Sequence, residues 1–63
     1  MVVTVFGLGF VGLSTAIAFA DKGITVYGIE VNEERRAKIA AGELPFYEPG
    51  LDEALERTLN KTF

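Results

Sequence analysis

The chain has 63 residues, 49% of them apolar and 24% charged, which leaves room for one small hydrophobic core and excludes a complete two-domain enzyme. Nine acidic and six basic residues give a net charge of −3, so neither nucleic acid nor an anionic membrane is expected as a partner. The chain contains no cysteine and no histidine, which excludes disulfides, zinc sites of the usual composition, and Cys–His or Ser–His nucleophile pairs.

The first twenty residues carry no charge, so a membrane span or a secretory signal is the alternative to weigh first. No basic residue precedes this stretch, however, and it contains three glycines within six positions, Gly7, Gly9 and Gly12. The β-branched opening predicts a strand over residues 2–6. Apolar residues at helical spacing then predict a helix over residues 10–22, which Gly23 ends. We therefore expect a folded strand and helix here rather than a membrane segment.

The second half of the chain repeats this alternation of elements. A β-rich run predicts a strand over residues 24–30, and Asn32 is a good N-cap for a helix over residues 33–41. A loop with two prolines leads to a third helix over about 50–60, with Pro49 at the first helical position. The helix is amphipathic, with leucines on one face and acids on the other.

The order strand, helix, strand, helix, helix predicts an α/β fold in which the first helix connects two parallel strands. Two parallel strands make a poor sheet, because parallel sheets are normally wider and covered on both faces. We therefore expect residues 1–63 to be the N-terminal part of a larger domain, and residues 61–63 to begin its third strand.

Residues 7–12 read Gly-Leu-Gly-Phe-Val-Gly and match G-x-G-x-x-G, the fingerprint of dinucleotide-binding Rossmann folds. The pattern alone is weak because glycine is common. Here it follows a predicted strand and opens a predicted helix, and Glu30 lies eighteen residues after Gly12, near the spacing expected for a ribose-binding acid. The sequence therefore predicts a Rossmann-type β-α-β unit that binds a dinucleotide.

Each glycine of this loop has an expected physical role. Gly7 allows the tight turn out of the strand, Gly9 lets a pyrophosphate approach the backbone, and Gly12 permits close packing of the helix on the strand. The amides at the helix start, around Phe10 and Val11, are expected to point at the pyrophosphate, with the helix dipole behind them.

Glu30 is the predicted acceptor for the hydroxyl groups of the adenosine ribose. A carboxylate at this position would repel the 2′-phosphate of NADP, so NAD is the predicted cofactor. Arg35 is assigned a contact near the adenosine, although Arg36 is a neighbouring candidate. Alternatively, Glu30 is a solvated residue at the end of the strand, or its charge interacts with the positive end of the following helix dipole. The alternative for Arg35 is a solvated cation on the helix surface.

Five aromatic and glycine residues have expected places in the fold. The core or the wall of the cleft is the expected place of Phe6, Phe10, Phe19 and Tyr27. Gly28 is unusual inside a strand, which indicates that the first helix or the cofactor approaches it closely.

The run Pro45-Phe46-Tyr47-Glu48-Pro49-Gly50-Leu51 is not part of the general dinucleotide fingerprint. Together with residues 7–13 and 28–33, it resembles the N-terminal region of the UDP-glucose/GDP-mannose dehydrogenase family, and the likeness covers essentially the whole chain. Phe10, Ser14 and Glu30 stand where the family often has Tyr, Pro and Asp. None of these departures removes a backbone amide.

The resemblance implies a cytoplasmic, homo-oligomeric enzyme of polysaccharide biosynthesis that uses NAD to oxidise the C6 hydroxyl of a nucleotide sugar to a carboxylate. The catalytic cysteine and its helpers come later in the family's sequences, so no catalytic residue is expected in these 63 residues. The resemblance carries over cofactor binding only: Gly7, Gly9, Phe10, Val11 and Gly12 at the pyrophosphate, Glu30 at the ribose, and Arg35 near the adenosine. Another Rossmann dehydrogenase and a non-catalytic dinucleotide-binding module are the alternatives.

Overall fold

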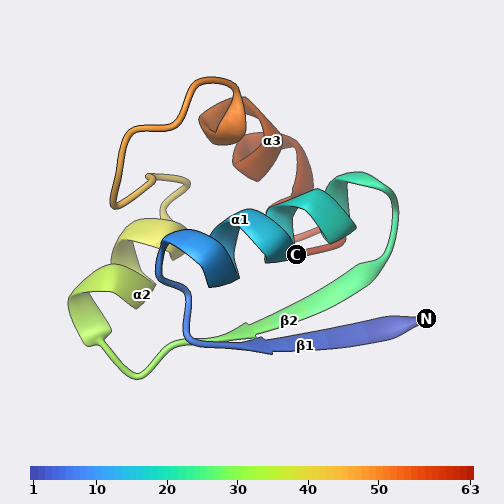
Figure 1. Cartoon of the computed structure of the whole chain (residues 1–63), viewed down its shortest axis with the longest axis horizontal. Helices are drawn as coiled ribbons and strands as arrows, with labels where there is room; N and C mark the ends of the chain where they lie inside the picture. The colour runs from blue at the N-terminus through green and yellow to red at the C-terminus, as the bar shows by residue number, and fades with distance from the viewer.

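A computed structural model describes all 63 residues and shows two strands and three helices (Figure 1). In chain order the elements are β1 (Val2–Phe6), α1 (Phe10–Asp21), β2 (Thr25–Ile29), α2 (Glu33–Ala40) and α3 (Leu51–Thr58). The two strands and three helices predicted over residues 2–60 are all present, with each end within two residues of its predicted position. The Rossmann-type β-α-β fold is thus confirmed.

The two strands form a parallel sheet with α1 between them in sequence. Val2 pairs with Thr25 and Phe6 with Ile29, so the strands are in register along their whole length. The carboxyl ends of both strands, the start of α1 and the start of α2 lie at the same end of the molecule, on the left of Figure 1. In open parallel sheets, ligands bind at this end.

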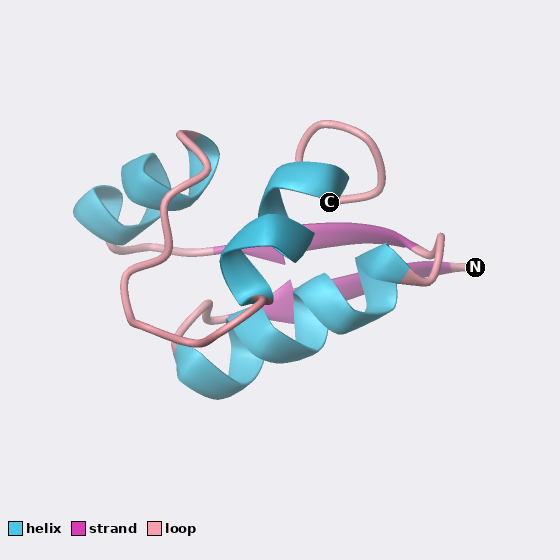
Figure 2. Ribbon diagram, turned by 90° about the horizontal axis from the view of Figure 1, so that it is seen from above, coloured by secondary structure: helices cyan, strands magenta, loops and turns pink.

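One face of the sheet is covered by α1, and α3 packs on α1 from the other side (Figure 2). Period-two alternation turns Val3, Val5 and Val26 toward the helices. The core residues share nearly complete burial: Leu8, Leu13, Ala16, Ile17, Ala20, Val26, Ile39, Ala54 and Leu55. None of the three helices is long and apolar enough to cross a membrane.

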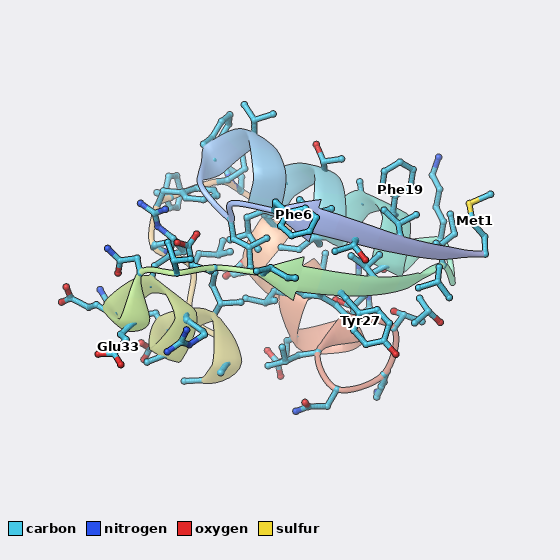
Figure 3. All side chains as sticks on the ribbon, turned by 90° about the horizontal axis from the view of Figure 1, so that it is seen from below. Met1, Phe6, Phe19, Tyr27 and Glu33 are labelled. Atoms are coloured by element: carbon cyan, nitrogen blue, oxygen red, sulfur yellow. The ribbon has the colours of Figure 1, made fainter.

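The opposite face of the sheet is open. Figure 3 views this face and shows Phe6 and Tyr27 on it with no helix in front of them. Phe6 is 75% exposed and Tyr27 61% exposed, while Phe19 on α1 is 37% exposed. None of these aromatic residues lies in the core, so that part of the prediction is wrong, while Tyr27 does line a hollow beside Gly28 and Phe63. The same alternation that turns Val5 and Val26 toward the helices turns their neighbours Phe6 and Tyr27 away from them.

The beginning of α3 differs from the prediction. Pro49 does not occupy the first helical position, because Gly50 is the N-cap and the helix begins at Leu51. Gly50 has a φ of 84°, a left-handed conformation that glycine adopts without a steric penalty. The chain therefore reverses at Gly50 and not at the proline.

The last three residues are not a strand, which corrects the prediction for 61–63. The carbonyl of Thr58 accepts hydrogen bonds from the N–H groups of all three, each at 3.0 Å, so they form a turn below α3. Asn60, with a φ of 62°, makes this turn possible. The turn still meets the sheet, because the N–H of Val26 donates to the carbonyl of Thr62 at 2.6 Å.

Candidate dinucleotide-binding site

The glycine loop, residues 7–12, leaves β1 in a sharp turn. Gly7 has a φ of 83° and its N–H donates to the carbonyl of Ile29 at 2.8 Å, so the turn is fixed to the end of β2. A Cβ atom on Gly12 would collide with the carbonyl oxygen of Gly7. Both glycines are therefore required by the backbone itself, and the role predicted for Gly12 in close packing is confirmed by this geometry.

The first turn of α1 presents free hydrogen-bond donors. The N–H of Leu13 is the first to be paired, at 2.8 Å from the carbonyl of Gly9, so the N–H groups of Phe10, Val11 and Gly12 have no protein acceptor. A Cβ on Gly9 would meet nothing within 4 Å, which leaves open space beside these amides. Convergent amides at a helix start suit the pyrophosphate of a dinucleotide.

The carboxylate of Glu30 lies between the glycine loop and the start of α2. Glu30 is only 7% exposed, and both carboxylate oxygens accept hydrogen bonds. Oε1 accepts from the N–H of Leu8 at 2.8 Å and Oε2 from the N–H of Asn32 at 2.9 Å. The guanidinium of Arg35 reaches Oε1 at 3.2 Å. Glu30 therefore connects the end of β2, the glycine loop and α2.

These contacts stabilise the charged form of Glu30. Hydrogen bonds from the backbone of Asn32 and Leu8, followed by the contact with Arg35, hold the pKa of the Glu30 carboxyl below its ordinary value of 4.5, although burial opposes the shift. Glu30 therefore remains a carboxylate at neutral pH, and a carboxylate is the form that accepts hydrogen bonds from ribose hydroxyls.

The start of α2 completes this polar region. Asn32 caps the helix, as predicted, because its Oδ1 accepts from the N–H of Arg35 at 2.9 Å. The guanidinium of Arg36 donates to the backbone carbonyl of Glu30 at 3.1 Å. The polar hollow, about 240 Å³ in volume, lies beside these contacts and is lined by Asn32, Glu34, Arg35, Lys38 and Pro45.

Leu8 is a residue of the site that the sequence reasoning did not single out. Its side chain is 4% exposed and belongs to the core, although it lies in a loop between two glycines. A Cβ on Gly28 would come within 2.9 Å of Leu8 and of Phe63. Gly28 is therefore small because of Leu8 and Phe63 and not because of the first helix. The sequence feature that could have indicated this buried loop residue is a large apolar side chain between two glycines.

The sequence model of the UDP-glucose/GDP-mannose dehydrogenase family, NAD binding domain, matches residues 1–63. The chain belongs to this family. NAD is thus the cofactor of the domain, in agreement with the prediction from the glycine loop and Glu30.

Curated relatives within the family include a UDP-glucose 6-dehydrogenase of Pseudomonas aeruginosa, which is 46% identical over 56 residues. A UDP-N-acetyl-D-mannosamine dehydrogenase of Methanococcus maripaludis is 43% identical over 58 residues. These matches cover 89% and 92% of this chain but only 12% and 14% of the relatives. The chain thus spans about an eighth of the length of the relatives it matches.

Solved structures of the family have the same fold. The UDP-glucose dehydrogenase from the archaeon Pyrobaculum islandicum superposes with a TM-score of 0.87 at 45% identity, over 92% of this chain and 13% of that one. The UDP-N-acetyl-mannosamine dehydrogenase of Staphylococcus aureus gives a TM-score of 0.91 at 39% identity, over 98% of this chain and 15% of that one.

In this member of the family, the loop between α2 and α3 also reaches the glycine loop. The ring of Phe46 contacts the ring of Phe10 edge-on, with a centroid distance of 5.0 Å and an interplanar angle of 66°. This contact joins two residues that lie 36 positions apart, and nothing in the local sequence pattern predicts it.

Proposed function

We propose that this chain is the NAD-binding part of a nucleotide-sugar 6-dehydrogenase, which oxidises the C6 hydroxyl of a nucleotide sugar to a carboxylate. The three free amides at the start of α1, beside the carboxylate of Glu30, carry this proposal. The relatives named UDP-glucose and UDP-N-acetyl-mannosamine dehydrogenases support the substrate class. Cytoplasmic location and homo-oligomeric assembly remain predictions from the family resemblance.

Each residue of the site has a proposed task in holding NAD. The open backbone at Gly9 and the amides of Phe10, Val11 and Gly12 bind the pyrophosphate. When bound, NAD supplies the hydride acceptor. Since the chain has no cysteine, which the family resemblance implies as the nucleophile, we assign it binding and orientation of the cofactor.

Glu30 and Arg35 are proposed to bind the adenosine side. Each carboxylate oxygen has a second lone pair, so Glu30 is able to accept from ribose hydroxyls while it keeps its bonds to Leu8 and Asn32. The side chain of Arg35 is 40% exposed and contacts Oε1 from the solvent side. We therefore expect Arg35 to shift toward the nucleotide when the ribose takes its place on Oε1.

The activity is tested on the product of the complete reading frame that contains these residues (the full-length protein). Incubation with UDP-glucose, GDP-mannose or UDP-N-acetyl-mannosamine should reduce two NAD per sugar and release a uronate. One NADH per sugar with an aldehyde or ketone product would contradict the four-electron reaction. If NAD binds but no nucleotide sugar is oxidised, the protein is instead another Rossmann dehydrogenase or a non-catalytic dinucleotide-binding module.

The ribose assignment has a separate test. Glu30→Ala in the full-length protein should weaken NAD binding by roughly tenfold to a hundredfold, because hydrogen bonds to a charged acceptor are lost. The preference for NAD over NADP should become smaller, because the carboxylate that repels the 2′-phosphate is gone while the cations Arg35 and Arg36 remain. Glu56→Ala, an exposed acid on α3, is the control, and calorimetry gives both affinities. Unchanged NAD binding in Glu30→Ala would remove Glu30 from the ribose site.

A further inference from the structure

The start of α1 has neither a capping side chain nor an acidic residue in its first turn. Its N-cap is Gly9. By contrast, α2 is capped by Asn32 and has two acids in its first turn. A glycine N-cap is well tolerated, but it offers no side-chain acceptor to the first amides of the helix. The amides proposed to bind the pyrophosphate therefore need support from elsewhere in the structure.

Phe46 supplies a contact at this point. Its ring packs edge-on against Phe10, the first residue of α1, which remains 56% exposed. Phe46 is itself half-buried and also packs against the hydrophobic core. It thus connects the first residue of α1 to the core. Edge-to-face contacts of this kind are stabilising beyond the area they bury.

The loop that carries Phe46 also borders the other side of the site. Pro45, its neighbour, lines the polar hollow together with Asn32 and Arg35. Between two prolines, the backbone of this loop has restricted freedom. The following residue, Tyr47, is 88% exposed and has no part in these contacts. The loop therefore places Phe46 at the glycine loop and leaves its other aromatic ring in solvent.

We propose that Phe46 is a positioning residue for NAD binding. It holds Phe10, and through Phe10 it fixes the N–H groups of the first turn of α1 in the orientation that receives the pyrophosphate. This inference rests on the proposed role of those amides. The run from Pro45 to Leu51, on which the family resemblance partly rests, would then contribute to the cofactor site through Phe46.

The test compares NAD with adenosine, which contains the ribose but no phosphate, in the full-length protein. Phe46→Leu keeps an apolar side chain and removes the ring. It should weaken NAD binding by about threefold to tenfold, the equivalent of one aromatic pair, and leave adenosine binding unchanged. Phe46→Tyr keeps the ring and should restore most of the NAD affinity. Titrations followed by calorimetry or NMR shifts measure both ligands.

Two further variants make the test specific. Phe10→Leu breaks the same contact from its exposed side, where loss of folding is not expected, and the double variant should bind NAD no worse than the weaker single variant. Tyr47→Leu changes the exposed aromatic of the same loop and should leave NAD affinity unchanged.

Several outcomes would overturn the inference. Equal losses of NAD and adenosine binding would indicate a general structural effect, and unchanged NAD affinity in Phe46→Leu and Phe10→Leu would remove the positioning role. Additive losses in the double variant would show that the two rings act separately. Absence of NAD binding by the unmodified full-length protein would instead overturn the proposed function itself, so the two failures are distinguishable.

Discussion

The two helices that follow β2 have equal length but are held in different ways. Both α2 and α3 have eight residues and two acids in the first turn. Helix α3 buries three residues and packs on α1 through Leu55, which is fully buried. Helix α2 buries only Ile39. Its remaining attachments are polar, and they gather around Asn32 and Glu30 at its start.

This difference links local stability to function. Apolar packing holds α3 whatever happens at the carboxyl end of the sheet. Helix α2 instead depends on Glu30, the residue that also bonds to the N–H of Leu8 in the glycine loop. We therefore expect changes at Glu30 to loosen α2 and the glycine loop together, and changes in the core to act on α3. Local opening measured by hydrogen exchange separates the two cases.

The largest expected effect comes from breaking the apolar attachment of α3. Leu55→Ala removes a fully buried side chain between α3 and α1 and should cost about 2–5 kcal/mol of unfolding free energy. Exchange protection in the full-length protein should fall first in residues 51–58, by mass spectrometry. Glu56→Ala, the exposed neighbour, is the control. If α2 lost as much exchange protection as α3, the two helices would depend on the same apolar contacts.

The second prediction breaks the polar attachment of α2 by acid. Because the pKa of Glu30 is lowered in the folded state, its carboxylate stabilises that state above its ordinary value of 4.5, and this contribution disappears as the pH falls through the lowered pKa. Protection factors of residues 33–40 and of the glycine loop should therefore decrease in acid. Arg35 is the cation that loses its carboxylate partner, whereas Arg36 keeps its bond to the backbone carbonyl of Glu30.

Glu30→Gln is the matched variant for this prediction. It lacks the carboxylate at every pH, so α2 should be less protected at pH 7 and should lose little more in acid. The pKa of Asp21 is also lowered, mainly by its hydrogen bond with Arg57, and this contribution to α3 persists in the variant. An acid response of α2 that is the same in both proteins would show that Glu30 is not its cause.

The two helices also differ in how well the sequence predicts them. The amphipathic spacing of α3 predicts both the helix and its buried Leu55, because the apolar residues that recur at helical spacing form the face that packs on the core. The glycine fingerprint likewise predicts the turn at Gly7 and the close approach at Gly12. These features depend on residues close together in the sequence, so they can be predicted without knowing the tertiary contacts.

What the sequence could not predict are contacts between distant residues. Glu30 was predicted to bind a ligand, but its bond to the N–H of Leu8 depends on how β2 ends beside the glycine loop. The contact between Phe46 and Phe10 has the same origin. Phe6 and Tyr27 are apolar yet lie on the open face, because hydrophobicity alone does not say which face of the sheet is covered.

The third prediction sharpens the account of α2 without changing a charge. Asn32→Ala removes the capping bond to the N–H of Arg35 and should cost about 1 kcal/mol of local stability. The backbone N–H of Asn32 still donates to Glu30, so the loss should be confined to residues 33–40. Asn32→Ser keeps a capping oxygen and should retain most of the protection. A loss in α3 as large as that in α2 would contradict the local role of this cap.

The smallest expected effect is at the one ion pair that helps to hold α3. The guanidinium of Arg57 donates to both carboxylate oxygens of Asp21, at 3.1 Å and 2.9 Å, and so joins α3 to the end of α1. The pair is exposed, and the negative charge of Asp21 lies at the unfavourable end of the α1 dipole, so the two effects oppose each other. Asp21→Asn should therefore reduce α3 protection less than Asn32→Ala reduces that of α2. The reduction should disappear in about 1 M salt, where such charges are screened. A loss that approached that of Leu55→Ala, or one that persisted in high salt, would show that α3 depends on this ion pair as α2 depends on Glu30.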